Sequence, residues 1–198
     1  MKPSPLTLER LEFSTISIEV NRDYENGETN ALPQLAFDFR GVNFRRSALL
    51  RYPHEEAADP KHFFCEFRLK ITKSDQKKII IPYELDIEVS ALFTYLDDRF
   101  TGAERFRAVR FTAYQMLYGA IREMVSNLTA RSVFGMLQLP SADFRQASRE
   151  DSEKDEKERL ELLAEQTPSP KPQLSDKTAI DPPPAKKTRS KRKNPPSE

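Results

Sequence analysis

The sequence predicts an α+β fold in which one long amphipathic helix packs on an antiparallel sheet. Residues up to about position 95 alternate between apolar and polar in several runs, as strands do, and one later stretch has the period of a helix. All 13 Phe and 6 Tyr lie at or before Phe144, whereas eight of the 15 prolines lie in residues 151–198. The first part can therefore bury a core, and the last part cannot offset the entropy cost of folding.

The first two predicted strands each contain an interruption. Residues 11–20 (LEFSTISIEV) change apolar phase in the middle, which predicts a β-bulge or break near Ser14 and Thr15. Residues 35–44 alternate until Gly41 and then shift phase, so a second bulge is expected there.

The two clearest strands follow, at residues 63–72 and 83–95. Apolar and polar residues alternate strictly along each strand, which indicates one buried face and one solvent-exposed face. The short polar connection over residues 74–78 predicts that the two strands form an antiparallel hairpin.

The pattern then changes to the helical period, and a helix is predicted over residues 111–128. Its apolar face is expected to pack on the sheet, and the same residues could also lie between dimers. The residues singled out for this role are Leu117, Ile121, Met124 and Leu128.

Three segments are predicted: a folded domain over residues 1–147, a charged extension over 148–166, and a disordered tail over 167–198. The extension favours helix by composition but carries few apolar residues. The tail is rich in proline and ends in KKTRSKRK at residues 186–193, a run with six positive charges.

Composition excludes several classes of protein. A single cysteine, Cys65, rules out an intramolecular disulfide framework and a multi-cysteine metal cluster. We find no apolar run long enough for a membrane span and no secretory leader pattern, so we expect a cytoplasmic protein. The net charge of +1 argues against a whole domain wrapped in nucleic acid.

No constellation of residues points to catalysis, to a cofactor or to a metal. Cys65 lies on the apolar phase of its strand, where an inert buried thiol is expected, and His54 and His62 have no spacing typical of a zinc site. Glu84 and Asp86 fall on the wet phase of a strand, as does Glu88, and are interpreted as solubilising charges. We therefore expect a protein that is not an enzyme.

The folded domain carries more aromatic and other apolar side chains than one buried sheet face can hold. Some strands have apolar side chains on both phases, whereas one helix covers only one face of the sheet. The remaining apolar surface must meet another subunit or a ligand. Either an oligomer interface or a groove for extended apolar peptides satisfies this requirement, and assembly can create such a groove. The groove candidates are Phe37, Phe39, Phe44, Phe63, Phe64 and Phe93.

Four motifs appear in order along the second half of the domain. EVSALF at residues 88–93 is the counterpart of a strand end of the form E-x-x-G-x-F, with alanine in place of the glycine. LYGAIREMVSNLT at 117–129 matches a helix core of the form L-[YF]-x-x-x-R-E-x-[IV]-x-x-L-T. Gly135 and LPSADF at 139–144 match a glycine-containing loop and an L-x-P-x-[ND]-F-like segment. These stretches, within residues 67–93 and 113–144, resemble the SecB-type preprotein chaperones.

The resemblance implies a four-stranded antiparallel sheet with helices on one face and a homotetramer built as a dimer of dimers. It also implies a chaperone that holds unfolded polypeptides in apolar grooves without nucleotide, with an export motor ATPase or an antitoxin as further partner. Ala91 stands where the family often has glycine, and the acidic export-motor-binding tail is replaced by a proline-rich tail with a basic end. An alternative is an oligomeric adaptor whose basic tail contacts nucleic acid.

Overall fold

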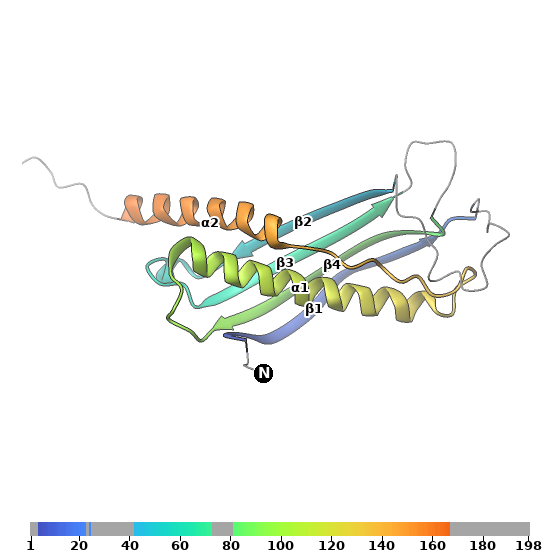
Figure 1. Ribbon diagram of the computed structural model, residues 1–198, viewed down its shortest axis with the longest axis horizontal. Helices are drawn as coiled ribbons and strands as arrows, with labels where there is room; N and C mark the ends of the chain where they lie inside the picture. Colours follow the sequence, from blue (N-terminus) through green and yellow to red (C-terminus); the bar gives the residue numbers. More distant parts are fainter. Residues whose placement is uncertain (1–3, 23, 25–41, 73–80, 167–198) are drawn as a thin grey trace, which may run out of the picture. The chain divides into compact units, whose positions relative to one another are not determined.

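The computed structural model describes residues 4–22, 24, 42–72 and 81–166 (Figure 1). Four antiparallel strands form one sheet in the order β1–β4–β3–β2. The bounds are β1 Leu6–Val20, β2 Asn43–Arg51, β3 His62–Thr72, β4 Tyr83–Tyr95, α1 Gly102–Thr129 and α2 Arg145–Gln166. The predicted α+β class is confirmed, and α2 is a second helix that packs beside α1.

Strands β3 and β4 form the predicted hairpin and lie in the middle of the sheet. Phe63 pairs with Phe93 at one end, and Ile71 pairs with Leu85 at the other. Every second residue of both strands is buried under α1, as strict alternation requires. These two strands and α1 supply most of the core.

Strand β1 contains the predicted bulge and a second one. Its register against β4 shifts between Phe13 and Thr15 and again between Leu8 and Arg10. Each shift compensates for a change in apolar phase, so one face of β1 carries the whole apolar set. That set is Leu6, Leu8, Leu11, Phe13, Ile16, Ile18 and Val20.

Strand β2 lies later in the chain than predicted. Only the end of the predicted strand over residues 35–44 falls in the described part, and the ladder with β3 continues to Arg51. Residues 45–51 (RRSALLR) lack clear alternation because Arg46 occupies the helix-bearing face and Leu49 the opposite one. The bulge expected at Gly41 lies outside the described residues.

Helix α1 begins nine residues before the predicted position. Phe106 and Val109 continue the buried face toward the amino terminus, and Gly102 starts the helix with a φ of 55°. Leu117 and Ile121 are buried as expected, whereas Leu128 is 49% exposed and does not pack on the sheet. No described helix is long and apolar enough to cross a membrane.

The chain then returns alongside α1 in an extended segment, residues 136–144. Tyr118 donates from its hydroxyl to the carbonyl of Pro140 at 2.6 Å, and Arg122 donates from Nε to the carbonyl of Leu139 at 3.1 Å. The amide of Leu137 donates to Thr129 Oγ1 at 2.7 Å. These bonds satisfy polar groups that would otherwise be costly to bury and fix the segment against the helix.

The sheet face opposite the helices is mainly polar. Arg68 binds both carboxylate oxygens of Asp86 at 2.7 and 2.8 Å, and Lys70 adds a contact to Asp86 at 3.3 Å. The hydrogen bonds from Arg68 lower the pKa of Asp86 despite partial desolvation. The second apolar face that the sequence suggested is thus restricted to a small patch, Leu49, Phe64 and Leu92.

Candidate functional site

An apolar hollow of about 300 Å³ opens beside the edge strand β2, on the helix-bearing side of the sheet. Its walls come from β2, β3, α1 and the returning segment after α1. The lining residues are Phe44, Arg46, Phe67, Leu69, Tyr118, Pro140, Ser141, Ala142 and Phe144. Pockets of this size and apolar character are typical binding sites.

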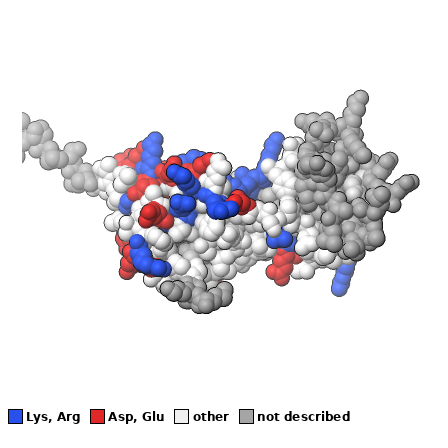
Figure 2. Space-filling model, in the orientation of Figure 1, with Lys and Arg blue, Asp and Glu red and all other residues white. Residues whose placement is uncertain are grey.

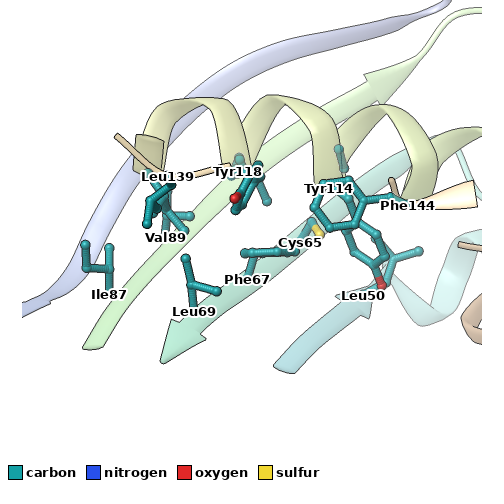
Figure 3. Packing of buried hydrophobic residues seen from close by; sticks show 14 of the residues in the cluster. Leu50, Cys65, Phe67, Leu69, Ile87, Val89, Tyr114, Tyr118, Leu139 and Phe144 are labelled. Atoms are coloured by element: carbon teal, nitrogen blue, oxygen red, sulfur yellow. The ribbon is translucent and has the colours of Figure 1, made fainter. Parts of the chain in front are cut away.

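Four aromatic rings pack together in the core beneath the hollow, and three of them, Phe67, Tyr118 and Phe144, also line it. The labelled rings are seen in Figure 3. The ring of Phe144 lies 5.8 Å from Phe67, 5.7 Å from Tyr114 and 5.5 Å from Tyr118, in each case edge to face. Such geometry is favourable beyond the area that it buries. The base of the hollow therefore belongs to the core.

The outer edge of β2 adds a second kind of binding group. Within the described part of the chain β2 pairs only with β3, so no strand is seen on its other side. An edge strand presents backbone donors and acceptors to an incoming extended chain. Backbone pairing at such an edge, with side chains in adjacent pockets, is a known mode of peptide recognition.

A second apolar surface follows the opposite edge strand. On the helix-bearing face of β1, Ile16 is 45% exposed and Val20 is also exposed, while Phe13 and Ile18 are half-buried. We call the apolar residues of β1 from Leu8 to Val20 on this face the β1 strip. Exposed apolar side chains on an edge strand are typical of surfaces that contact another chain or a ligand.

The structure separates the groove candidates predicted from the sequence. Phe63 and Phe93 are each 1% exposed beneath α1, so they are core residues and offer no surface to a ligand. Phe44 is 38% exposed and lines the hollow. Phe64 lies on the opposite face beside a smaller hollow of about 210 Å³. The remaining two candidates, Phe37 and Phe39, lie outside the described residues.

Helix α2 docks beside this site through polar groups. Its buried residues are Ser148, Ser152 and Asp155, which share one face at i, i+4 and i+7. Small serine side chains let the helices approach closely, and Asp155 binds Arg110 of α1 through two hydrogen bonds of 2.5 and 2.6 Å. Charged side chains accordingly gather over α2 and the start of α1 in Figure 2.

The Arg110–Asp155 pair is buried and extends into a network. Arg110 also donates to the hydroxyl of Tyr114, which in turn donates to Asp151 Oδ2 at 2.9 Å. Desolvation opposes the charge on Arg110, but the hydrogen bonds and charge of Asp155 outweigh it and raise the pKa of Arg110. Burial raises the pKa of Tyr114 to about 12. Burial raises the pKa of Asp155, and the hydrogen bonds and charge of Arg110 oppose that rise. At neutral pH Tyr114 is a neutral donor.

Gly102 shows how closely α2 meets the start of α1. A Cβ atom at this position would lie 2.9 Å from Oε1 of Glu156. The positive φ of Gly102 already disfavours other residues. The carboxylate of Glu156 thus lies at the amino terminus of α1, where the helix dipole favours negative charge.

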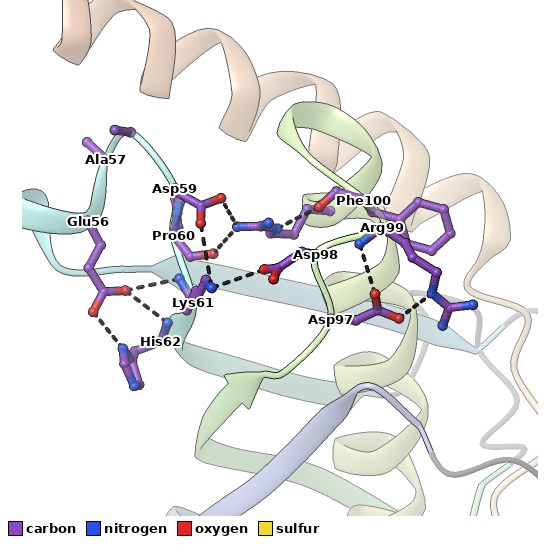
Figure 4. Close-up of polar contacts among 12 residues, drawn as sticks. Glu56, Ala57, Asp59, Pro60, Lys61, His62, Asp97, Asp98, Arg99 and Phe100 are labelled. Carbon is purple, nitrogen blue, oxygen red and sulfur yellow. Dashed lines mark hydrogen bonds and ion pairs between the residues drawn. The ribbon is translucent and has the colours of Figure 1, made fainter.

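The residues considered for catalysis or metal binding do not converge. Cys65 is fully buried, and desolvation raises the pKa of its thiol to about 12, which keeps it protonated and unreactive. His62 binds Glu56 through Nδ1 at 2.6 Å on the surface (Figure 4). It lies on the face of β3 opposite to that of Cys65. Among the described residues no group of three or more His, Cys, Asp or Glu could hold a metal ion.

Sequence reasoning missed Arg46 and the docking of α2. Arg46 lies in a strand without alternation, and α2 docks through two serines and an aspartate, so neither carries an apolar signal. Tyr118 and Phe144 lie within the motifs that resemble SecB-type chaperones, but the amino-acid sequence alone does not show that they line a hollow.

Comparison with known proteins shows distant likenesses to solved structures. No family model and no curated protein matches the chain. A solved structure of the Mycobacterium tuberculosis SecB-like chaperone Rv1957, in complex with a ChAD peptide from the Rv1956 HigA1 antitoxin, is similar at 20% identity and a TM-score of 0.48. It covers 70% of this chain and 90% of the other.

A second solved structure, a Streptococcus agalactiae protein of unknown function, is similar at 14% identity and a TM-score of 0.39. It covers 69% of this chain and 97% of the other. Both likenesses are too distant to carry a function from those proteins to this one.

The buried pair between α1 and α2 generates a prediction. Asp155→Ala leaves the charge of Arg110 buried without a partner and should lower the free energy of unfolding by about 3–5 kcal/mol. Urea unfolding followed by circular dichroism measures this loss. Glu153→Ala is the matched control on the same helix. The pair of Glu153 with Arg149 is exposed, so this change should lower the free energy of unfolding by less than about 1 kcal/mol.

Replacing both partners tests whether the loss comes from the unpaired charge. Arg110→Met combined with Asp155→Leu removes both charges and should recover most of the stability lost in Asp155→Ala. A double variant as unstable as the single one would show that Asp155 acts in some other way.

Proposed function

We propose that this chain is an ATP-independent holdase chaperone that binds unfolded or pre-export polypeptides. The observation that carries the proposal is the apolar hollow beside the outer edge of β2. An extended client would pair its backbone with β2 and place side chains next to Phe44. Burying one large apolar side chain is worth about 2 kcal/mol, so a few contacts per client suffice for micromolar binding.

The sequence resemblance to SecB-type chaperones supports the same proposal independently of the hollow. The helix string at residues 117–129 lies in the part of α1 that carries Tyr118, one wall of the hollow. We propose that clients are either proteins awaiting export or an antitoxin of a toxin–antitoxin pair, because both present extended apolar segments. The protein would act in the cytoplasm, without catalysis and without a cofactor.

Side chains on alternate positions of a client strand would face opposite sides of the sheet. One set would meet the hollow at Phe44, and the other would lie beside the residues of β2 on the opposite face, such as Ser47 and Leu49. Phe64 lies one strand farther in, on β3, and at the other end of the ladder from Phe44. Of the aromatics in the described part of the chain that the sequence suggested, Phe44 therefore remains in the proposed site.

We propose further that the chain forms a homotetramer, a dimer of dimers, and that the β1 strip is one of its two kinds of interface. The exposed apolar residues of the strip lie on a strand that pairs only with β4 among the residues described. Assembly along this edge would remove from water the apolar surface that α1 leaves uncovered.

Suppression of aggregation tests the holdase proposal. The full chain at stoichiometric ratio should suppress light scattering by a reduced, unfolded client in the absence of ATP. Phe44→Ser should weaken this effect several-fold because it removes an apolar wall of the hollow. Leu160→Ser is the matched control, since Leu160 is exposed on α2 and does not line the hollow.

The same assay separates the holdase from the adaptor. Deleting residues 186–198 should leave the suppression unchanged. A chain that never lowers light scattering, or a deletion that abolishes the effect, would contradict the proposal.

Native mass spectrometry tests the assembly. The wild-type chain should have a mass near four chains, and Ile16→Glu should shift it toward smaller species, because a charge in the β1 strip would be desolvated on assembly. Glu12→Gln, on the other face of the same strand, is the control and should leave the mass unchanged. A wild-type monomer would overturn this part of the proposal.

A further inference from the structure

Among the described residues that line the hollow, Arg46 is the only one with a charged side chain. It lies two residues after Phe44 on β2, and both side chains point to the helix-bearing face, since their partners on β3 are Leu69 and Ile71. An apolar pocket and a guanidinium group are thus adjacent along the same edge strand.

The surroundings of Arg46 leave part of its guanidinium available. The group lies over the ring of Tyr114 at 4.9 Å, and its Nη2 donates to Asp151 Oδ2 at 3.0 Å. Asp151 also accepts from Tyr114 and lies 3.6 Å from Nζ of Lys154. A guanidinium has five N–H donors, so one bond to Asp151 leaves capacity for a second carboxylate.

Arg46 is the charged group nearest to a segment bound in the hollow, because its ion-pair partner Asp151 lies on α2 and is not among the described residues that line the hollow. An arriving carboxylate would be attracted to this guanidinium, whereas an arriving ammonium group would be repelled by it. Arginine is also the side chain best suited to bind a carboxylate through two parallel hydrogen bonds.

We infer that the hollow selects client segments in which a large apolar residue and an acidic residue are separated by one residue. On a strand paired with β2, side chains two positions apart lie on the same face about 7 Å from each other. When the apolar side chain occupies the hollow at Phe44, the acidic side chain reaches Arg46. This inference names the client class of the proposed function and rests on it.

Fluorescence anisotropy with three nine-residue peptides tests the inference. The peptides share a central leucine with a serine on each side. They differ only at the two positions beyond the serines, which are both glutamate, both glutamine or both lysine, so that either direction of the client strand is covered. The full-length chain should bind the glutamate peptide roughly fivefold more tightly than the glutamine peptide, as a partly exposed charge pair gives, and the lysine peptide most weakly.

Three variants locate the effect. Arg46→Gln should abolish the preference for glutamate while retaining binding of the glutamine peptide. Arg45→Gln, on the same strand but opposite face, should keep the preference. Asp151→Asn removes the carboxylate that competes for Arg46 and should preserve or increase the preference.

The outcomes distinguish this inference from the proposed function. Equal affinity of the wild-type chain for all three peptides overturns the client preference and leaves the holdase proposal standing. A chain that binds none of the peptides contradicts the holdase proposal itself. Loss of the preference in both Arg46→Gln and Asp151→Asn would show that Arg46 acts by holding α2 and would overturn the inference.

Discussion

A four-stranded sheet is wider than one helix. A helix with its side chains is about 10–12 Å across, and neighbouring strands are about 4.8 Å apart, so α1 covers the central strands and leaves the two edge strands to other parts of the chain or to a partner. The burial of the inward-facing residues follows this geometry. Those of β3 and β4 are buried, whereas Ile16 on β1 and Phe44 on β2 remain exposed.

The two edges are completed in different ways. At β2, the returning segment after α1 and the first turns of α2 lie beside the strand and leave a bounded hollow with an aromatic base. At β1, two bulges bring the apolar residues to one face, and the described part of the chain leaves several of them partly exposed. The bounded hollow suits a client segment, and the continuous strip suits another copy of the chain.

Charge has a separate role in this structure. The sheet face away from the helices carries ion pairs such as Arg68–Asp86, which keep this face hydrated. The α1–α2 contact instead depends on the buried Arg110–Asp155 pair, and Arg46 links that contact to the hollow through Asp151. The helix that borders the hollow is therefore positioned by polar contacts, which tie its placement to the charge state of a few residues.

Much of the fold could be predicted from the sequence because it follows from periodicity. Strict alternation predicted the β3–β4 hairpin, and the change of phase near Ser14 predicted a bulge in β1. Periodicity could not predict which aromatics are accessible: Phe63 and Phe44 are both on the helix-bearing face, but only Phe44 lies at the edge. The docking of α2 was also unpredictable, because Ser148, Ser152 and Asp155 give no apolar pattern.

The central claim is that the edge of β2 receives an extended polypeptide. Hydrogen–deuterium exchange of the full chain, measured with and without a reduced, unfolded client, tests this claim directly. The account predicts that the client slows exchange at amides of Asn43–Arg51 more than at those of the central strand β4. Unchanged exchange along β2 in the presence of a bound client would contradict it.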